Sequence, residues 1–309
     1  MYFKMTRAAV TVMGGAAALC LGSVPAALAA PASNTASVPC NAYALFLAIT
    51  QAHNGETLYL APGCTYYLPD ALPAIRADLT IVGYHSTLMR TRNAGSFSLL
   101  TVGGGCSVDL AVPNVNPDDG GCTGNLTVIN VNFTDGGGSD TDEGGAIHNR
   151  GTLDVEGGTF SGNKTGEYGG AIYNDGHMTV TNATFTGNLA PYGGAIYTED
   201  DASIGGSSFT WNKAPTLFGE RDNSDGGAIY NDGDLDITNS GFLANSTGGY
   251  GGAIYTDDNL HAGHITVTAN AAGFDGGGIY NDDETVTLSG SAVFGNQPDN
   301  CHDVAGCFF

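Results

Sequence analysis

The chain has 309 residues and a strongly acidic composition, with 31 Asp and Glu against 9 Lys and Arg and a net charge of −22. Such a surface excludes nucleic acid and anionic membranes as natural partners, and it suits cations and neutral or basic ligands. For most of the individual acids, the simpler interpretation is that their charge keeps the protein soluble.

Residues 1–29 have the features of a secretory signal peptide. Lys4 and Arg7 form a basic start, residues 8–28 are mostly apolar and small, and Ala27-Leu28-Ala29 fits the small-x-small cleavage rule. Glycines and a proline interrupt the apolar segment, and no other apolar run is long enough to cross a bilayer. Cleavage removes two of the nine basic residues and no acid, so residues 30–309 would carry a net charge of −24. We therefore expect a secreted, extracellular protein without a membrane span.

Six cysteines remain after this cleavage, and an even number in an exported chain indicates disulfides. They lie near the two ends of the chain and in one insertion, outside the repeats described below. Six cysteines allow fifteen pairings, and proximity in sequence favours one of them. The predicted pairs are Cys40–Cys64, Cys106–Cys122 and Cys301–Cys307.

The first part of the predicted domain, residues 30–125, contains a cap and irregular first coils. Residues 41–52 (NAYALFLAITQA) have the spacing of a short amphipathic helix with Asn41 near its start. This helix would cover the open end of the structure that follows. Strands are expected within 55–68 and 77–88, and 103–124 reads as an insertion.

The central part, residues 126–296, repeats two motifs in constant phase. The first, Gly-Gly-Ala/Gly-Ile-aromatic-Asn/Thr, recurs at steps of 25, 24, 33, 25 and 25 residues, starting at Gly144, Gly169, Gly193, Gly226, Gly251 and Gly276. The second is an aliphatic pair followed by Phe-x-x-Asn, in about seven copies. In its last two copies Val267 and Val293 take the Phe position, and in its first copy Gly136 replaces the Asn.

Each repeat holds three short apolar segments separated by Gly, Asn or Asp, which is typical of one coil of a β-solenoid. Stacking coils about 4.8 Å apart would place identical positions above one another. One predicted core column is Phe133, Phe160, Phe185, Phe209 and Phe242, and another is Ile147, Ile172, Ile196, Ile229, Ile254 and Ile279.

The Asn after each Phe is interpreted as structural, because a stacked Asn tolerates positive φ and can hydrogen-bond its neighbours above and below. These residues are Asn163, Asn188, Asn212, Asn245, Asn270 and Asn296.

These patterns predict an all-β fold, a right-handed single-stranded parallel β-helix with a short N-terminal capping helix. Residues 30–309 would form a single domain. Residues 297–309 would close its C-terminal end, with Phe308 and Phe309 available to plug the last coil.

The paired GGAI and FxxN motifs resemble the repeats of chlamydial polymorphic outer membrane proteins, and of secreted bacterial right-handed β-helix proteins, over residues 126–301. The resemblance implies the β-helix fold and, for the chlamydial members, an adhesin role at the cell surface. The first coils also look like those of pectate-lyase-like proteins, a likeness of fold that does not carry function.

Acidic residues recur directly after the Ile-Tyr-Asn/Thr segments. Stacked carboxylates repel one another, which raises their pKa values or recruits cations, so a calcium-binding edge is one interpretation. A solvated acidic turn row and a catalytic carboxylate pair are the alternatives, since neighbouring coils would hold carboxylates about 5 Å apart. The residues are Asp175, Glu199, Asp200, Asp232, Asp257, Asp258, Asp282 and Asp283.

The 33-residue step marks an insertion at 213–225, next to the single tryptophan. Insertions in solenoids often form binding loops, and an aromatic ring beside mixed charge can stack on a sugar. The alternative is an ordinary loop with the tryptophan packed beneath it. The candidate binding residues are Trp211, Phe218, Glu220, Arg221 and Asp222.

The leading functional hypothesis is a secreted, non-enzymatic structural or binding protein, adhesin-like, that presents an acidic face to an extracellular glycan or cell-surface ligand. No cofactor is required, and calcium bound on that face is the one candidate. The alternative is a polysaccharide hydrolase or lyase. The seven basic residues of the secreted chain are scattered, and none recurs in register on neighbouring repeat coils, which disfavours a lyase.

Overall fold

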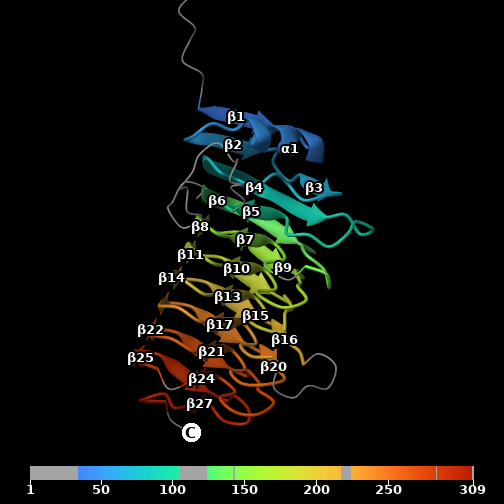
Figure 1. Cartoon of the computed structure of the whole chain (residues 1–309). Coiled ribbons are helices and arrows are strands. Elements are labelled where there is room, and N and C mark those ends of the chain that lie inside the picture. Colours follow the sequence, from blue (N-terminus) through green and yellow to red (C-terminus); the bar gives the residue numbers. More distant parts are fainter. Residues whose placement is uncertain (1–33, 105–123, 142, 217–223, 283, 308–309) are drawn as a thin grey trace, which may run out of the picture. The chain divides into compact units, whose positions relative to one another are not determined.

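The computed structural model describes residues 34–104, 124–141, 143–216, 224–282 and 284–307. These described residues form a parallel β-solenoid of about ten turns with one short N-terminal helix (Figure 1). The turns outnumber the seven repeat copies because irregular coils precede them, as the sequence predicted. The predicted signal peptide, Cys106–Cys122 pair and plug of Phe308 and Phe309 lie outside the described residues.

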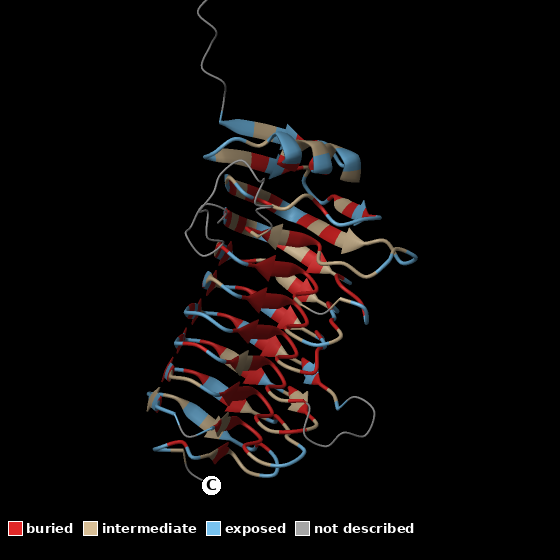
Figure 2. Ribbon diagram, in the orientation of Figure 1, coloured by how far each residue is buried: buried red, intermediate tan, exposed pale blue. Residues whose placement is uncertain are grey.

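Each repeat coil contributes one strand to sheet B and two strands to sheet A. The sheet B strand comes from the GGAI motif, and the two sheet A strands come from the aliphatic pair and from the Phe position. The strand pairings of the described residues are parallel, and those between repeat coils join identical motif positions, for example Ile172 with Ile147 and Ile196. Figure 2 shows buried residues along the strands and exposed ones mainly at the corners.

The strand bounds follow this coil pattern. Sheet A begins with β1 (Thr35–Val38), β2 (Glu56–Leu60), β3 (Thr65–Leu68), β4 (Asp78–Arg90) and β6 (Asn125–Thr134). Its aliphatic strands are β8 (Thr152–Glu156), β11 (His177–Thr181), β14 (Ala202–Gly205), β18 (Leu235–Thr238), β22 (Leu260–Gly263) and β25 (Val286–Ser289). Its Phe-position strands are β9 (Thr159–Ser161), β12 (Thr184–Thr186), β15 (Ser208–Thr210), β19 (Gly241–Leu243), β23 (Thr266–Thr268) and β26 (Ala292–Phe294).

Sheet B runs down the other side of the coil. Its strands are β5 (Leu100–Val102), β7 (Ile147–Asn149), β10 (Ile172–Asn174), β13 (Ile196–Thr198), β17 (Ile229–Asn231), β21 (Ile254–Thr256), β24 (Ile279–Asn281) and β27 (Cys301–His302). A third, two-stranded sheet consists of β16 (Lys213–Ala214) and β20 (Ser246–Thr247).

The N-terminal end is covered by the predicted helix, α1 (Ala42–Gln51). Asn41 caps it, because its Oδ1 accepts hydrogen bonds from the backbone N–H groups of Tyr43 and Ala44 at 2.8 and 3.2 Å. Leu45 and Ile49 are buried in the core cluster. The predicted disulfide Cys40–Cys64 is present, with a Cα–Cα distance of 5.6 Å, and fastens the start of the helix to the chain just before β3.

The predicted Phe column is confirmed. Phe133, Phe160, Phe185, Phe209 and Phe242 stack with ring centroids 4.7–4.8 Å apart, and each is at most 1% exposed. Val267 and Val293 continue the column in register on the last coils. The predicted Ile column is also confirmed, and all six of its members are fully buried. The core of the repeat region is therefore built from these columns.

The predicted hydrogen bonding of the Asn column is confirmed as well. Asn188 shows the pattern: both its backbone N–H and its Nδ2 donate to Asn212 Oδ1 on the next coil, at 3.0 and 2.9 Å. Its Nδ2 also donates to the carbonyl of Phe160, on the preceding coil, at 3.0 Å. At the first copy the backbone N–H of Gly136 still donates to Asn163 Oδ1, which explains how that copy tolerates glycine.

The positive φ expected at these Asn residues instead lies one position earlier. That position holds glycine on some coils, such as Gly187 (φ 62°), but Trp211 (φ 60°), Ala244 (φ 56°) and Ala269 (φ 56°) on others. The Asn side chains take part in the ladder with ordinary backbone geometry, so the tight corner falls on the residue before them. A side chain in the left-handed region is strained, while glycine is not.

Replacing Ala269 with glycine is therefore expected to raise the free energy of unfolding by about 1 kcal/mol. The reciprocal change, Gly187→Ala, should lower it by a similar amount, since a Cβ at Gly187 would meet no atom within 4 Å and only backbone conformation changes. Chemical denaturation of both variants measures this. Equal effects of the same sign would contradict the assignment of strain to this corner.

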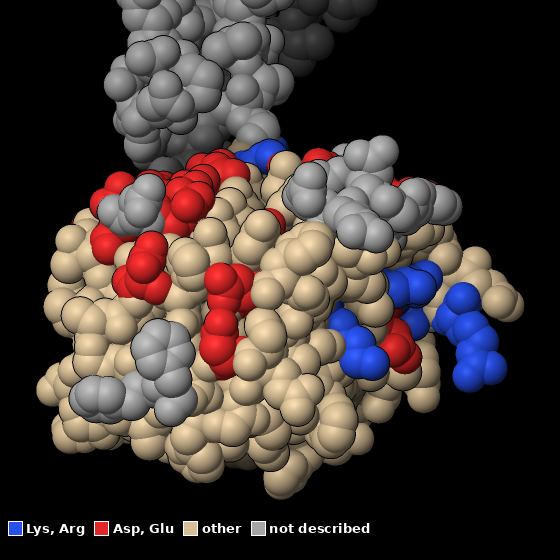
Figure 3. Space-filling model, turned by 90° about the horizontal axis from the view of Figure 1, so that it is seen from below, with Lys and Arg blue, Asp and Glu red and all other residues tan. Residues whose placement is uncertain are grey.

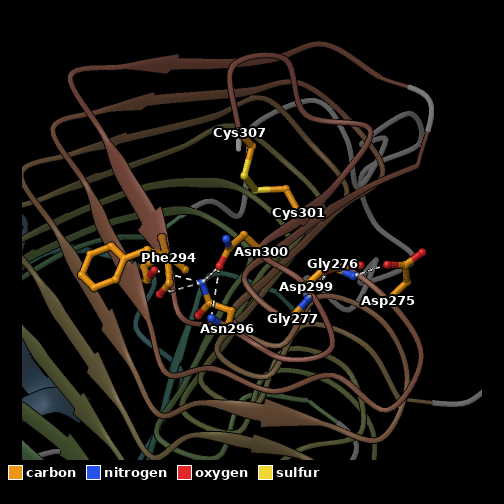
Figure 4. Close-up of a disulfide and its surroundings, with 10 residues drawn as sticks. Asp275, Gly276, Gly277, Phe294, Asn296, Asp299, Asn300, Cys301 and Cys307 are labelled. Carbon is orange, nitrogen blue, oxygen red and sulfur yellow. Dashed lines mark hydrogen bonds between the residues drawn. A yellow bond between two sulfur atoms is a disulfide. The ribbon is translucent and has the colours of Figure 1, made fainter. Parts of the chain in front are cut away.

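The C-terminal end closes the last coil by imitating the repeat. Asn300 Oδ1 accepts from the backbone N–H and the Nδ2 of Asn296, at 3.1 and 3.2 Å, as the next Asn of the column would (Figure 4). The predicted disulfide Cys301–Cys307 is present, with a Cα–Cα distance of 6.2 Å. Asn300 thus extends the Asn column beyond the last repeat coil, and the disulfide joins β27 to the end of the described chain.

Candidate functional site

A column of tyrosines covers the outer face of sheet B. In each Ile-Tyr-Asn/Thr strand the Ile points into the core, and the Tyr points to the opposite side because side chains alternate along a strand. Ring centroids along the column are 4.6–5.6 Å apart, from Tyr173 through Tyr197, Tyr230, Tyr255 and Tyr280. His148 precedes the column and His302 follows it, with its ring 4.6 Å from that of Tyr280.

A second aromatic row packs over this column. Tyr168, Tyr192 and Tyr250 lie just before the Gly-Gly pairs, and their rings contact those of the column, with centroids 4.6–6.2 Å apart. As a result, Tyr173 and Tyr197 are only 5% and 7% exposed. The flat faces of the column are therefore occupied by other rings, and the surface presents phenol groups and ring edges.

The predicted acidic row borders the tyrosine column on one side. Its backbone continues the ladder beyond sheet B, as where the Asp232 N–H donates to the Thr198 carbonyl at 2.8 Å. Tyr173 and Tyr255 donate their hydroxyl hydrogens to Glu199 and Asp282 on the following coils, at 2.8 and 3.0 Å. The described members are Asp175, Glu199, Asp200, Asp232, Asp257, Asp258 and Asp282, while Asp283 lies outside the described residues.

Carboxylates of this row have raised pKa values. Burial raises the pKa of Asp175, and the nearby Asp200 adds to the shift against the lowering effect of Arg150. Burial and the charge of Asp258 raise the pKa of Asp232. Burial, followed by neighbouring acids that include Asp232, raises the pKa of Asp257. The stacked like charges thus interact as the sequence predicted.

Acids also lie on the other side of the column. The pKa of Tyr230 is raised by burial and then by the charges of Asp257, Asp232 and Asp225. Burial and the neighbouring Glu167 raise the pKa of Tyr168 to about 12. We call the tyrosine column with its two acidic borders the sheet B face. It is a strongly negative surface lined with hydroxyl groups, suited to cationic or hydrogen-bonding ligands.

Metal binding on this face stays a prediction. Among the described residues, no group of three or more His, Cys, Asp or Glu side chains is placed to hold a metal ion together. Calcium on the acidic row would therefore have to use fewer carboxylates, with backbone carbonyls or water as its other ligands.

His148 occupies the first position of the column, where later coils have tyrosine. It is 8% exposed, and burial, followed by the charge of Arg150, lowers its pKa to about 4. Its Nε2 lies 3.3 Å from Glu143 Oε2, without hydrogen-bond geometry, and the same oxygen lies 3.2 Å from Arg150 Nη2. Since Glu143 already pairs with Arg150, His148 gains little from becoming charged.

This pKa predicts a pH dependence of stability. The unfolded histidine titrates near 6.5, so its stabilising effect is complete above that pH and is lost as pH falls through about 4. The loss should be roughly 3 kcal/mol in total. The variant His148→Tyr, which restores the tyrosine of the other coils, should lack this loss. Denaturation of both proteins from pH 7 to pH 4 tests it, and parallel curves would contradict it.

A coupled carboxyl pair lies at the C-terminal end, where sequence reasoning predicted only a closure. A hydrogen bond with Asp299 lowers the pKa of Asp275, while burial and the same hydrogen bond raise the pKa of Asp299. Asp275 Oδ2 also lies 2.8 Å from His302 Nδ1. The backbone N–H groups of Gly276 and Gly277 donate to Asp275 Oδ1 and Asp299 Oδ1, at 2.9 and 3.3 Å, and hold the two acids in place (Figure 4). Twenty-four residues separate the two acids in sequence, so only stacking brings them together.

The tryptophan beside the insertion has an exposed side chain. Trp211 is 60% exposed, and the two interpretations of the insertion stay predictions, because residues 217–223 lie outside the described residues. Its predicted partners Phe218, Glu220, Arg221 and Asp222 lie outside the described residues. Trp211 stands at the corner after the Phe strand, whereas the acidic row stands at the corner after sheet B. The acidic row and the candidate binding residue Trp211 therefore start from different corners of the coil.

A family model for the Chlamydia polymorphic membrane protein repeat matches residues 157–175 and 182–199. Both segments run from the Phe strand through the Asn corner to the GGAI strand of the next coil. The chain therefore contains these repeats in a β-solenoid fold, which confirms the predicted resemblance. A comparison with curated proteins finds no match. Within the described residues, no helix has both the length and the apolar character needed to cross a membrane.

Proposed function

We propose that this chain is a secreted, non-enzymatic binding protein, adhesin-like, whose sheet B face engages a ligand on a cell surface or in the extracellular matrix. The observation that carries the proposal is the repetition of one acidic, hydroxyl-rich unit on successive coils in strict register. Such repetition offers a long uniform surface, and a catalytic centre instead requires a few unique groups around one bond.

Two further observations support an extracellular setting. Disulfides join Cys40 to Cys64 and Cys301 to Cys307, and such bonds persist mainly in oxidising compartments. The matched repeat family is described as one of membrane proteins. Together with the signal-peptide features of residues 1–29, these observations favour export.

The alternative, a carbohydrate-active enzyme, draws support from the coupled pair Asp275 and Asp299. Two carboxyl groups with pKa values shifted in opposite directions can act as acid and base. The pKa shifts of the two acids come from a hydrogen bond between them, however, whereas hydrolases hold their two carboxyl groups about 5 Å or more apart, on either side of the glycosidic bond.

A glycan array probed with and without calcium, and again with a chelator, tests the proposal. We expect selective binding to one ligand class and no product from that ligand in a reducing-sugar assay. Binding that disappears with chelator would assign calcium to the acidic row. Release of reducing sugar from any bound polymer would overturn the proposal in favour of the enzyme.

The sheet B face can be tested with matched charge variants. Asp175, Asp232 and Asp257 have raised pKa values, so replacing all three with Asn should leave the fold intact while weakening binding at least about tenfold. The control replaces the exposed acids Asp154, Glu156 and Asp236 on sheet A strands with the matching amides, removing the same charge elsewhere. Equal weakening by both triple variants would show that net charge, and not this face, attracts the ligand.

A further inference from the structure

Basic side chains gather at one hollow in this otherwise acidic protein. A hollow of about 490 Å³ is lined by Tyr67, Met89, Arg90, Arg92, Asp135, Gly162 and Lys164. It collects three of the nine Lys and Arg residues of the chain, although they come from different coils. Figure 3 shows most of the visible Lys and Arg side chains on one side of the molecule, apart from most Asp and Glu. We call this site the basic hollow.

One cation of the basic hollow, Arg90, is held in place without being neutralised. Arg90, at the end of β4, donates from Nε to the Asp135 carbonyl and from Nη1 to the Ala94 carbonyl, both at 3.0 Å. These bonds use backbone oxygens, so the guanidinium is oriented and keeps its charge. None of Arg90, Arg92 and Lys164 forms an ion pair with another described residue. With one carboxylate, that of Asp135, on its lining, the hollow has a net positive charge.

An aromatic ring lies beside these cations. Tyr67 on β3 pairs in register with Met89 on β4, so the two side chains stand next to each other at the hollow. Tyr67 is 61% exposed, unlike the tyrosines of the sheet B face. A flat exposed ring packs against the carbon-bound hydrogens of a sugar, whereas a small inorganic anion gains nothing from it.

We propose that the basic hollow binds a sugar that carries a sulfate or carboxylate group. The planar Arg90 guanidinium and the exposed Arg92 and Lys164 hold the anionic group through charge-assisted hydrogen bonds. The sugar ring packs on Tyr67, and the Asp135 carboxylate accepts a hydrogen bond from a sugar hydroxyl. This site is separate from the sheet B face and has the opposite charge, so one solenoid carries two binding surfaces of different selectivity.

Calorimetric titration of the whole protein with four small probes tests this proposal. The probes are lactose, lactose 3′-sulfate, 3′-sialyllactose and inorganic sulfate. We expect one or both anionic sugars to bind at least about tenfold more tightly than lactose and than inorganic sulfate. Which anionic sugar binds distinguishes sulfate from carboxylate recognition. Equal binding of lactose and the anionic sugars, or of inorganic sulfate and the anionic sugars, would overturn the proposal, as would no binding at all.

Single substitutions distinguish a specific binding site from general electrostatic attraction to the basic side chains. Lys164→Gln, Arg92→Gln and Tyr67→Ala should each weaken binding of the preferred sugar by about fivefold or more. Lys213→Gln is the matched control, because Lys213 is also an exposed lysine and lies in the same ladder row, two coils away with Leu189 between. The affinity of the Lys213→Gln variant for the preferred sugar should change by less than about twofold. Equal losses for Lys164→Gln and Lys213→Gln would overturn the assignment of a site.

Discussion

Replacing Asn212 with alanine is expected to lower the free energy of unfolding by about 4 kcal/mol. Asn212 is fully buried, and its Oδ1 accepts from the backbone N–H and Nδ2 of Asn188. Its own Nδ2 donates to the carbonyl of Phe185 and to Asn245 Oδ1, at 3.1 and 3.0 Å. Alanine removes all four hydrogen bonds and leaves buried donors of Asn188 without partners, each of which costs about 1–3 kcal/mol.

Chemical denaturation followed by circular dichroism measures this change. Asn125→Ala is the control, because Asn125 is exposed and its Nδ2 makes one side-chain hydrogen bond, to Asp78. The free energy of unfolding of that variant should fall by less than about 1 kcal/mol. Similar midpoints for the two variants would mean that the Asn column contributes little to stability. If Asn212→Ala fails to fold, Asn296→Ala offers a milder version, since Asn296 lies near the end of the column and is 7% exposed.

Replacing Phe185 with alanine should lower the free energy of unfolding by a similar amount, about 4 kcal/mol. Phe185 is fully buried at the centre of its column, with rings stacked on both sides at 4.7 and 4.8 Å. Truncation removes the contacts with both neighbours and leaves a cavity that the paired strands cannot collapse to fill. Phe185→Val should be tolerated better than alanine, because Val267 and Val293 occupy the same position on later coils.

Calorimetry tests this prediction, with Leu243→Ala as the control. Leu243 neighbours a Phe of the column on β19 but points outward and is 46% exposed, so its truncation should cost less than about 1 kcal/mol. In a solenoid each coil contacts mainly its neighbours, so unfolding can lose two-state character around a weakened coil. A Phe185→Ala midpoint equal to that of Leu243→Ala would contradict a core built from this column.

The structure of the repeat region could be predicted because its core residues recur at a regular spacing in the sequence. A Phe or Ile that returns every 24–27 residues in fixed phase, apart from the one step of 33, specifies both its neighbours and its burial, so the columns and their register followed from the sequence. The tyrosine column was missed because Ala-Ile-Tyr was treated as one apolar segment. The alternation of side chains along a strand was the signal that could have separated the inward Ile from the outward Tyr.

The basic hollow could not be predicted, for a different reason. Tyr67, Arg90 and Arg92 come from the irregular first coils, where no repeat fixes the register and β4 shifts register between Val82 and Ser86 against β6. Their proximity to Lys164 depends on where that strand ends relative to the Asn corner. The net charge of −22 also gives no sign of the site, because it sums over acidic and basic regions of the surface.

The in-register ladder of sheet B has a consequence for recognition. A partner that contacts two or three coils finds nearly equivalent positions all along the face, so it can bind at several offsets. These alternative alignments add a favourable statistical term to the affinity. They also allow a bound molecule to shift by one coil, about 4.8 Å, without first dissociating. Such a surface would bind a polymer tightly without fixing the position of the polymer along the solenoid axis.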